Sequence, residues 1–287
     1  MMMKTIGLIL GLFLMLAPAA LAAGSPSAAS PWQSTPYGRT RLIAAMDGVG
    51  PGAQALAFGW QVELADGWKT YWRSPGEAGL PPRLQWRQSG NIAGLTVAWP
   101  LPERYSLYGY DTAVYRGEVV LPLTVALREP GKSATLDLAV DYMVCKEVCV
   151  PLQARYVLSL PAKEAPAQSR ESHAIAAYAA AVPKMGLAEV KRVAFDPQSS
   201  ALLIEAALRL PSRRITDVFV IGPDDLAFGR ASGNGGSPLQ VPVMGRSPAA
   251  VAGRTITLVF ADDQGAGYAW SGAVAATACL SPSLQQC

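Results

Sequence analysis

Apolar runs of strand length, separated by turn residues, recur along most of this chain. In the region 40–161 the apolar runs end at breaks such as Asp66-Gly67 and Ser74-Pro75-Gly76. Runs rich in β-branched and aromatic residues, bounded by Gly, Pro and Asn, are typical of strands. We therefore predict strands at 55–64, 69–73, 84–86, 95–99, 114–127, 136–144 and 150–160. Many short strands at this spacing favour an all-β sandwich or barrel.

A second β-patterned region follows a connector at 162–183. The connector is rich in Pro, Ala and charged residues, and its Ala-rich part at 174–182 predicts a short helix. After it, strands are predicted at 189–196, 201–208, 217–221, 239–243, 255–261 and 268–275. The sequence thus predicts two tandem β-sandwich domains, 40–161 and 184–276, followed by a tail at 277–287.

The first 22 residues have the layout of a secretory signal peptide. Lys4 supplies the basic region, residues 6–16 the apolar core, and Ala20-Leu21-Ala22 the small-residue cleavage site. The apolar run is short for a membrane span, so we expect cleavage, export to the periplasm and no stable membrane insertion; an uncleaved anchor is the alternative. Residues 23–39, rich in Ala, Ser and Pro, are expected to form a disordered leader.

Composition excludes some functional classes. The net charge is +3, and 16% of residues are charged against 51% hydrophobic. The chain has no basic stripe, so nucleic acid is not an expected partner. The single histidine, His173, argues against a histidine-based metal centre or a Cys-His catalytic pair, and no cofactor is expected.

Two of the four cysteines, Cys145 and Cys149, flank a three-residue connection between two predicted strands. If the strands form a hairpin, these positions face each other at about 4.5–5.5 Å between Cα atoms. That separation permits a disulfide, and export permits it chemically. A bond that closes so short a loop removes little unfolded-state entropy, which favours a redox role over a structural one.

Two other interpretations of the cysteine pair stay open. It is a structural disulfide if the chain is a non-catalytic β-sandwich interaction module. Alternatively, Met143, Cys145 and Cys149 are soft ligands suited to Cu(I), as in a copper-tolerance protein. Cys279 and Cys287 either form a disulfide in the tail or remain free thiols.

The region 42–160 resembles the periplasmic N-terminal domain of the thiol:disulfide interchange protein DsbD, and most closely its ScsB (suppressor of copper sensitivity) branch. The resemblance rests on Leu107-Tyr108-Gly109, Tyr115-Arg116, Val120-Leu121-Pro122-Leu123-Thr124-Val125, the strand entering Cys145, and the segments 66–81 and 99–102. It implies an immunoglobulin-like fold with a redox-active Cys145/Cys149 pair. It also implies a cap over the pair, here Leu107, Tyr108, Gly109 and Tyr110, with Leu107 in place of the family phenylalanine. The loop between the cysteines is shorter here than in DsbD.

The resemblance further implies electron transfer from a membrane-embedded thiol transporter to periplasmic thioredoxin-like or disulfide-isomerase-like partners. The chain is then a component of a protein-disulfide reductase, and the family pattern favours Cys149 as the cysteine that first engages partners. Exchange requires a thiolate; Lys146 favours it and Glu147 opposes it, so the sequence gives no net effect.

Overall fold

The computed structural model describes residues 28–87, 90–233 and 238–275. The expected signal peptide and the tail cysteines, Cys279 and Cys287, lie outside these ranges. The described chain is almost entirely β-structure, as the sequence predicts, with one short α-helix. In the part of the chain that is described, no helix is long and apolar enough to cross a membrane.

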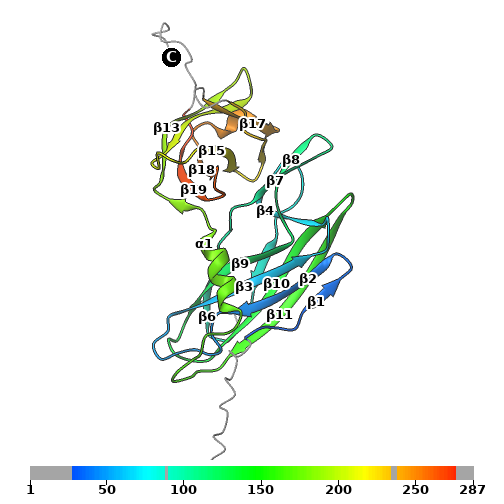
Figure 1. Cartoon of the computed structure of the whole chain (residues 1–287), viewed down its shortest axis with the longest axis vertical. Helices are drawn as coiled ribbons and strands as arrows, with labels where there is room; N and C mark the ends of the chain where they lie inside the picture. The colour runs from blue at the N-terminus through cyan, green and yellow to red at the C-terminus, as the bar shows by residue number, and fades with distance from the viewer. Residues whose placement is uncertain (1–27, 88–89, 234–237, 276–287) are drawn as a thin grey trace, which may run out of the picture.

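Two sheets form the N-terminal half of the structure (Figure 1). The five-stranded sheet has the order β1 (Gln33–Thr35), β2 (Gly38–Ala44), β3 (Ala55–Leu64), β9 (Glu118–Leu127) and β6 (Ile92–Val97). The six-stranded sheet has the order β11 (Cys149–Leu160), β10 (Ala134–Cys145), β4 (Lys69–Gly76), β8 (Tyr110–Arg116) and β7 (Glu103–Leu107), and β5 (Arg83–Trp86) also pairs with β10. All these neighbours are antiparallel.

The core of these N-terminal sheets follows from the alternation of side chains along each strand. In β10, residues alternate between buried and half-buried positions along its length, because successive side chains of a strand point to opposite faces. Trp60 of β3 lies in this core against Tyr142 of β10, and its indole N–H donates to the hydroxyl of Tyr156 at 3.2 Å. The indole N–H of Trp60 and the hydroxyl of Tyr156 therefore partner each other inside the core.

Two four-stranded sheets form the C-terminal half, with a core of their own. One has the order β12 (Lys184–Met185), β19 (Gly267–Ala273), β18 (Thr255–Asp262) and β15 (Ile215–Ile221). The other has the order β13 (Ala188–Asp196), β14 (Ala201–Leu208), β17 (Leu239–Gly245) and β16 (Leu226–Phe228). A 3₁₀ turn, η1 (Pro248–Val251), precedes β18.

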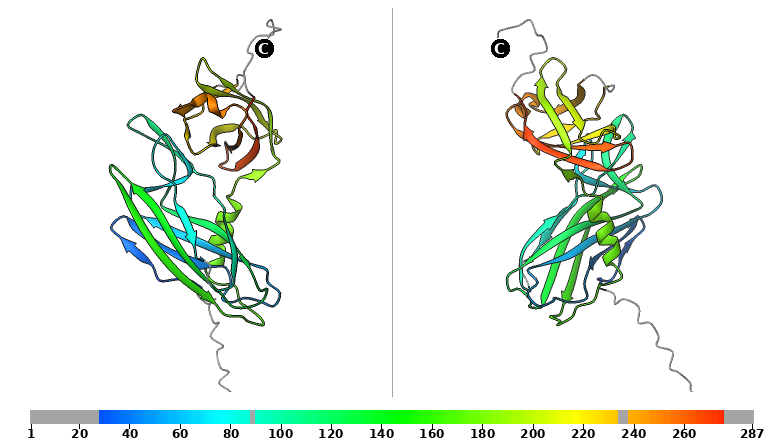
Figure 2. Two further views of the ribbon diagram at one scale, coloured as in Figure 1. Left: turned by 180° about the vertical axis from the view of Figure 1, so that it is seen from behind. Right: turned by 60° about the vertical axis from the view of Figure 1, so that its left-hand side comes forward.

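The connector packs along the N-terminal sheets. Its helix α1 (Ser172–Ala180) inserts Ile175 into a small cluster with Ile43 and Val120. Upstream of the helix, Lys163 forms an ion pair with Asp47 at 2.7 Å. The helix and the segment before it therefore pack against the first half, and the two views in Figure 2 show the helix beside the N-terminal sheets.

The two halves contact each other through β4, β7 and β15. Trp72 of β4 lies edge-on to Phe219 of β15, with ring centroids 5.8 Å apart. Arg104 of β7 forms a two-pronged ion pair with Asp217 at 2.9 and 3.0 Å. Phe219 is part of the same apolar cluster as the N-terminal core, so this contact is an apolar seam with an ion pair at its edge.

Two expectations from the sequence are wrong in detail. The predicted strand 114–127 is two strands, β8 and β9, because Gly117 turns the chain with a φ of +64°, a conformation that glycine adopts readily. Residues 28–39 of the expected disordered leader are ordered. Residues 33–35 pair with β2, and the ring of Trp32 carries the guanidinium groups of Arg39 and Arg41 on it, each 4.3 Å from the centroid.

Candidate functional site

The cysteine pair lies at the tip of the β10–β11 hairpin, as the spacing predicts. Cys145 is paired with Cys149 across the hairpin and with Lys69 across the β10–β4 ladder. Directly opposite residues in an antiparallel pair point to the same face. The side chains of Cys145, Cys149, Lys69 and, two residues further along β4, Tyr71 thus share the outer face of the six-stranded sheet, while Trp72 points into the core.

The two cysteines are joined by a disulfide, with their Cα atoms 4.1 Å apart. The backbone N–H of Lys146 donates to the carbonyl of Val148 at 3.1 Å, which closes the loop between them. The two sulfurs differ in access, because Cys145 is 1% exposed and Cys149 is exposed. A partner approaching from solvent therefore meets Cys149 first.

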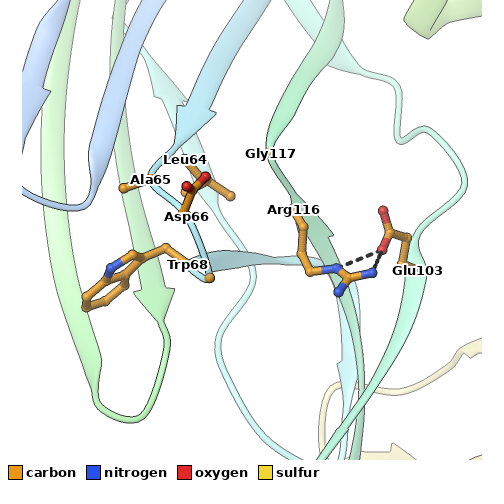
Figure 3. Close-up of a pocket in the computed structure, with 8 residues that line it drawn as sticks. Leu64, Ala65, Asp66, Trp68, Glu103, Arg116 and Gly117 are labelled. Atoms are coloured by element: carbon orange, nitrogen blue, oxygen red, sulfur yellow. Dashed lines mark hydrogen bonds and ion pairs between the residues drawn. The ribbon is translucent and has the colours of Figure 1, made fainter.

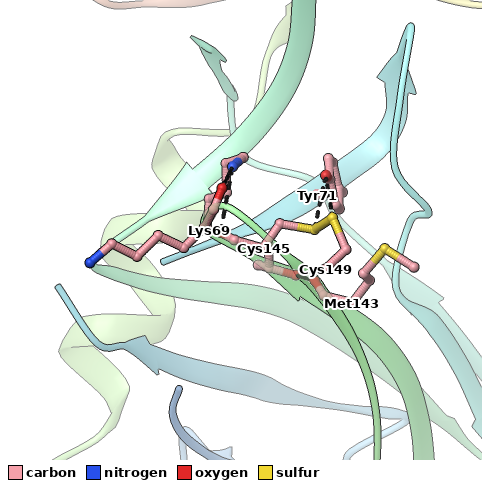
Figure 4. The surroundings of a disulfide bond; sticks show 7 residues. Lys69, Tyr71, Met143, Cys145 and Cys149 are labelled. Carbon is pink, nitrogen blue, oxygen red and sulfur yellow. Dashed lines mark hydrogen bonds between the residues drawn. A yellow bond between two sulfur atoms is a disulfide. The ribbon is translucent and has the colours of Figure 1, made fainter. Parts of the chain in front are cut away.

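Tyr71 lies against the disulfide (Figure 4). Its hydroxyl donates to the sulfur of Cys145 at 3.1 Å and lies 3.7 Å from the sulfur of Cys149. Gly79, at a φ of +97°, packs on the Tyr71 ring so closely that a Cβ there would lie 2.2 Å from ring atoms. Burial raises the pKa of Tyr71, so the hydroxyl stays protonated and remains a hydrogen-bond donor at neutral pH.

Lys69 supplies a buried cation beside the pair. Its ammonium donates to the backbone carbonyls of Cys145 at 3.5 Å and Lys146 at 3.3 Å, and lies 4.3 Å from the centroid of the Tyr105 ring. The residue is 3% exposed, and burial lowers the pKa of its amine.

Lys146, which lies between the two cysteines in the sequence, extends away from them. Its ammonium donates to the backbone carbonyl of Asp66 at 3.5 Å. There it borders a recess of about 340 Å³ (Figure 3), whose lining includes Asp66, Trp68 and the ion pair of Arg116 with Glu103. The recess is open and charged, and it lies beside the cysteine hairpin.

The expected cap residues lie at the tip of the neighbouring β7–β8 hairpin. Leu107 ends β7, Tyr108 and Gly109 form the turn, and Tyr110 begins β8. Tyr108 is 79% exposed and Tyr110 56% exposed, and Tyr108 has a positive φ of 52°. Among the described residues, the side chain that hydrogen-bonds the sulfurs is Tyr71 and not one of these four.

Met143 is the third member of the alternative copper set. It lies two residues before Cys145 on the same face of β10 and packs, half-buried, against the cluster of Tyr71, Val114 and Cys145. Met143 and the two cysteines are thus together, as a soft-ligand site requires. Within the described residues, no group of three or more His, Cys, Asp or Glu side chains could hold a metal ion.

Sequence reasoning did not assign roles to Lys69 and Tyr71, although both lie in the segment 66–81 that carries the resemblance. Their alternation in a predicted strand places them on one face. Cys145, which both side chains contact, lies 74 to 76 positions later in the chain. The pairing of β4 with β10 that brings these residues together is not readable from sequence spacing.

Comparison with known proteins agrees with this geometry. Residues 49–161 match the family "Thiol:disulfide interchange protein DsbD, N-terminal", which confirms the resemblance seen in the sequence. The chain also shares its fold with the crystal structure of the N-terminal periplasmic domain of ScsB from Proteus mirabilis, with a TM-score of 0.69 and 24% identity over 87% of this chain and 99% of that one. No curated protein sequence matches the chain.

Proposed function

We propose that this chain, whose residues 49–161 carry a domain of the DsbD N-terminal family, passes electrons by thiol–disulfide exchange through Cys145 and Cys149. The observation that carries the proposal is the asymmetric disulfide. An exposed Cys149 is bonded to a buried Cys145 whose sulfur accepts a hydrogen bond from Tyr71 at 3.1 Å. A structural disulfide has no need of an accessible sulfur on one side and a hydrogen-bond donor on the other.

The first step transfers two electrons into the pair. A thiolate of a reduced donor attacks the Cys149 sulfur, the Cys145–Cys149 bond breaks, and its electron pair leaves with Cys145 as a thiolate. The hydroxyl of Tyr71 already points at the sulfur on which this charge appears. A second donor thiolate then attacks the donor's own sulfur in the mixed disulfide and releases Cys149, which leaves the donor oxidised and this protein as a dithiol.

The second step reverses these roles. The Cys149 thiolate attacks a disulfide of the acceptor, and the Cys145 thiolate then attacks Cys149 and releases the reduced acceptor. We propose a membrane-embedded thiol transporter as donor and periplasmic thioredoxin-like or disulfide-isomerase-like proteins as acceptors. In this account the chain is a periplasmic protein-disulfide reductase component, exported by the signal peptide at 1–22, with two tandem immunoglobulin-like domains.

The cap remains part of the proposal. Tyr108 is 79% exposed, so in this oxidised structure its ring is not covered by the rest of the molecule. To protect the reduced pair, the tip of the β7–β8 hairpin must bend toward Cys149. The tip must then move away again when a partner docks.

Variants that keep one cysteine of the pair, in a chain whose Cys279 and Cys287 are replaced by serine, test the exchange. Thioredoxin activated as a mixed disulfide with a chromogenic thiol serves as the probe, and intact mass measures the product. Cys145→Ser, which keeps the exposed thiol, should form a stable mixed disulfide. Cys149→Ser, which keeps the buried thiol, should react far more slowly. Equal rates for the two variants would contradict the assignment of Cys149 as the attacked sulfur, and no product with either would overturn the exchange function.

Copper binding is the second candidate, and the packing of Met143 against Cys145 favours it. A site of two thiolates and a thioether suits Cu(I). Titration of the reduced protein with Cu(I) in competition with a chromogenic chelator decides it. Stoichiometric binding that Met143→Leu weakens, in a protein without exchange activity, would replace the redox function with this one.

A further inference from the structure

We propose that Lys69 is a positioning residue for the redox pair, whose buried ammonium stabilises the thiolate of Cys145. This inference rests on the proposed exchange function and identifies the charge that controls it. In the sequence the cation next to the cysteines is Lys146, which lies between them beside the opposing charge of Glu147.

The β-ladder fixes the position of Lys69. It is the direct cross-strand neighbour of Cys145, and Cβ atoms of such pairs lie about 4.5–5.5 Å apart on the same face. Hydrogen bonds to the carbonyls of Cys145 and Lys146 hold the ammonium at the start of the cysteine loop. The Tyr105 ring lies on another side of it, so the charge has little freedom to move away.

The charge of Lys69 is not cancelled nearby. In the described part of the chain it forms no ion pair, and its recorded partners are two carbonyls and an aromatic ring. A cation that is 3% exposed interacts with a neighbouring charge more strongly than a solvated one does.

The other charged and titratable groups around it have their own partners or face solvent. On β8, Arg116 pairs with Glu103 of β7. In the cysteine loop, Lys146 binds the carbonyl of Asp66, and Glu147 is exposed. The tyrosines that face Lys69 on its own strand and on β7 are Tyr71 and Tyr105. Lys69 is thus the cation in this set that is both buried and without a counterion.

Lys69 acts when the disulfide breaks. The electron pair of the Cys145–Cys149 bond leaves with Cys145, so a negative charge appears on the residue directly across the ladder from Lys69. A cation held next to a thiol favours the ionised form and lowers its pKa. No proton leaves Lys69 in this step, and its contribution is electrostatic.

The test compares Lys69→Met with Lys146→Met in the full chain carrying Cys149→Ser, so that Cys145 is the thiol at the site. Methionine keeps an unbranched apolar stem and removes the charge. The pKa of Cys145 is read from the pH profile of ultraviolet thiolate absorbance. The absorbance of the Cys145→Ser/Cys149→Ser double variant is subtracted at each pH. We expect Lys69→Met to raise this pKa by about one unit, Lys146→Met to leave it nearly unchanged, and Lys69→Arg to restore it in part.

With both cysteines present, Lys69→Met should slow reduction of the disulfide by dithiothreitol about threefold, because a one-unit rise in the pKa of the leaving thiol is only partly expressed in the exchange rate. If Lys69→Met does not fold, Lys69→Gln, which can still donate to the two carbonyls, takes its place. A folded, neutral variant with unchanged pKa and rate would overturn the role of Lys69. Loss of exchange in the wild-type chain would instead overturn the proposed function, so the two failures are distinguishable.

Discussion

Replacing Tyr71 with phenylalanine removes one oxygen atom, the one that hydrogen-bonds the buried sulfur. The ring stays, so the packing of Gly79 on it is kept. Cys145 is 1% exposed, so water cannot easily replace the lost donor. Hydrogen bonds to charged groups contribute about 1.5–3 kcal/mol, and each 1.36 kcal/mol corresponds to one pKa unit. Tyr71→Phe should therefore raise the pKa of Cys145 by about 1–2 units.

The same change should slow reduction of the disulfide by roughly 3- to 10-fold, because Cys145 leaves as a thiolate and its pKa is only partly expressed in the rate. The free energy of unfolding of the oxidised protein should fall by only about 1 kcal/mol, because the disulfide sulfur is a neutral hydrogen-bond acceptor. The assays are thiolate absorbance against pH in the Cys149→Ser background, stopped-flow reduction by dithiothreitol, and urea unfolding.

Tyr178→Phe is the matched control. Its hydroxyl donates to the backbone carbonyl of Glu118 at 2.6 Å, in the five-stranded sheet and not the sheet that carries the cysteines. The control should lose stability without any change in thiol pKa. If Tyr71→Phe behaves like the control, with lower stability but an unchanged pKa and reduction rate, the hydroxyl has no part in the chemistry.

Three further outcomes follow from other parts of the molecule. Asp217→Asn breaks the partly buried ion pair with Arg104 and should lower the free energy of unfolding by about 2–3 kcal/mol. Urea unfolding measures this loss, and a change within error would show that the apolar seam alone holds the two halves in contact. Asp262 should make stability depend on pH: burial alone would raise the pKa of its carboxyl, but the N–H groups of Ala266 and Gln264, the Tyr268 hydroxyl and Arg213 lower it overall. The folded state then favours the ionised carboxylate, so this stabilisation is present above the ordinary pKa of about 3.9 and is lost as pH falls below it. The free energy of unfolding of Asp262→Asn should therefore depend less on pH across that point than that of the unchanged protein. An equal pH dependence in the two proteins would refute this role of Asp262. Tyr108→Ala should speed oxidation of the reduced pair by hydrogen peroxide if the β7–β8 tip caps it, and an unaltered rate would remove the cap from the account.

Much of the fold was readable because its signals are local. The strands at 55–64 and 201–208 have the bounds that the apolar runs predict. The break between β8 and β9 was missed because Gly117 stands alone inside a long apolar stretch, with no second turn residue beside it. The leader was misjudged because its order comes from tertiary contacts, Trp32 with two arginines and β1 with β2, which composition does not reveal.

The site divides in the same way. The disulfide was predictable, since both cysteines belong to one hairpin and their spacing sets the register. Tyr71 and Lys69 reach the pair from β4 through a ladder that connects residues more than 70 positions apart. From the sequence, Lys146 and Glu147 oppose each other near the thiols and their net effect is open; in the structure the Lys146 side chain turns toward Asp66.

The central claim is that the Cys145–Cys149 disulfide is reversible in the range where thioredoxin-like proteins operate. Equilibration of the full chain with graded ratios of reduced and oxidised glutathione or dithiothreitol, followed by acid quenching, thiol labelling and intact mass, gives its reduction potential. The account predicts a value between about −180 and −270 mV, the range of disulfide isomerase and thioredoxin. A value below about −300 mV, typical of structural disulfides in secreted proteins, would contradict it.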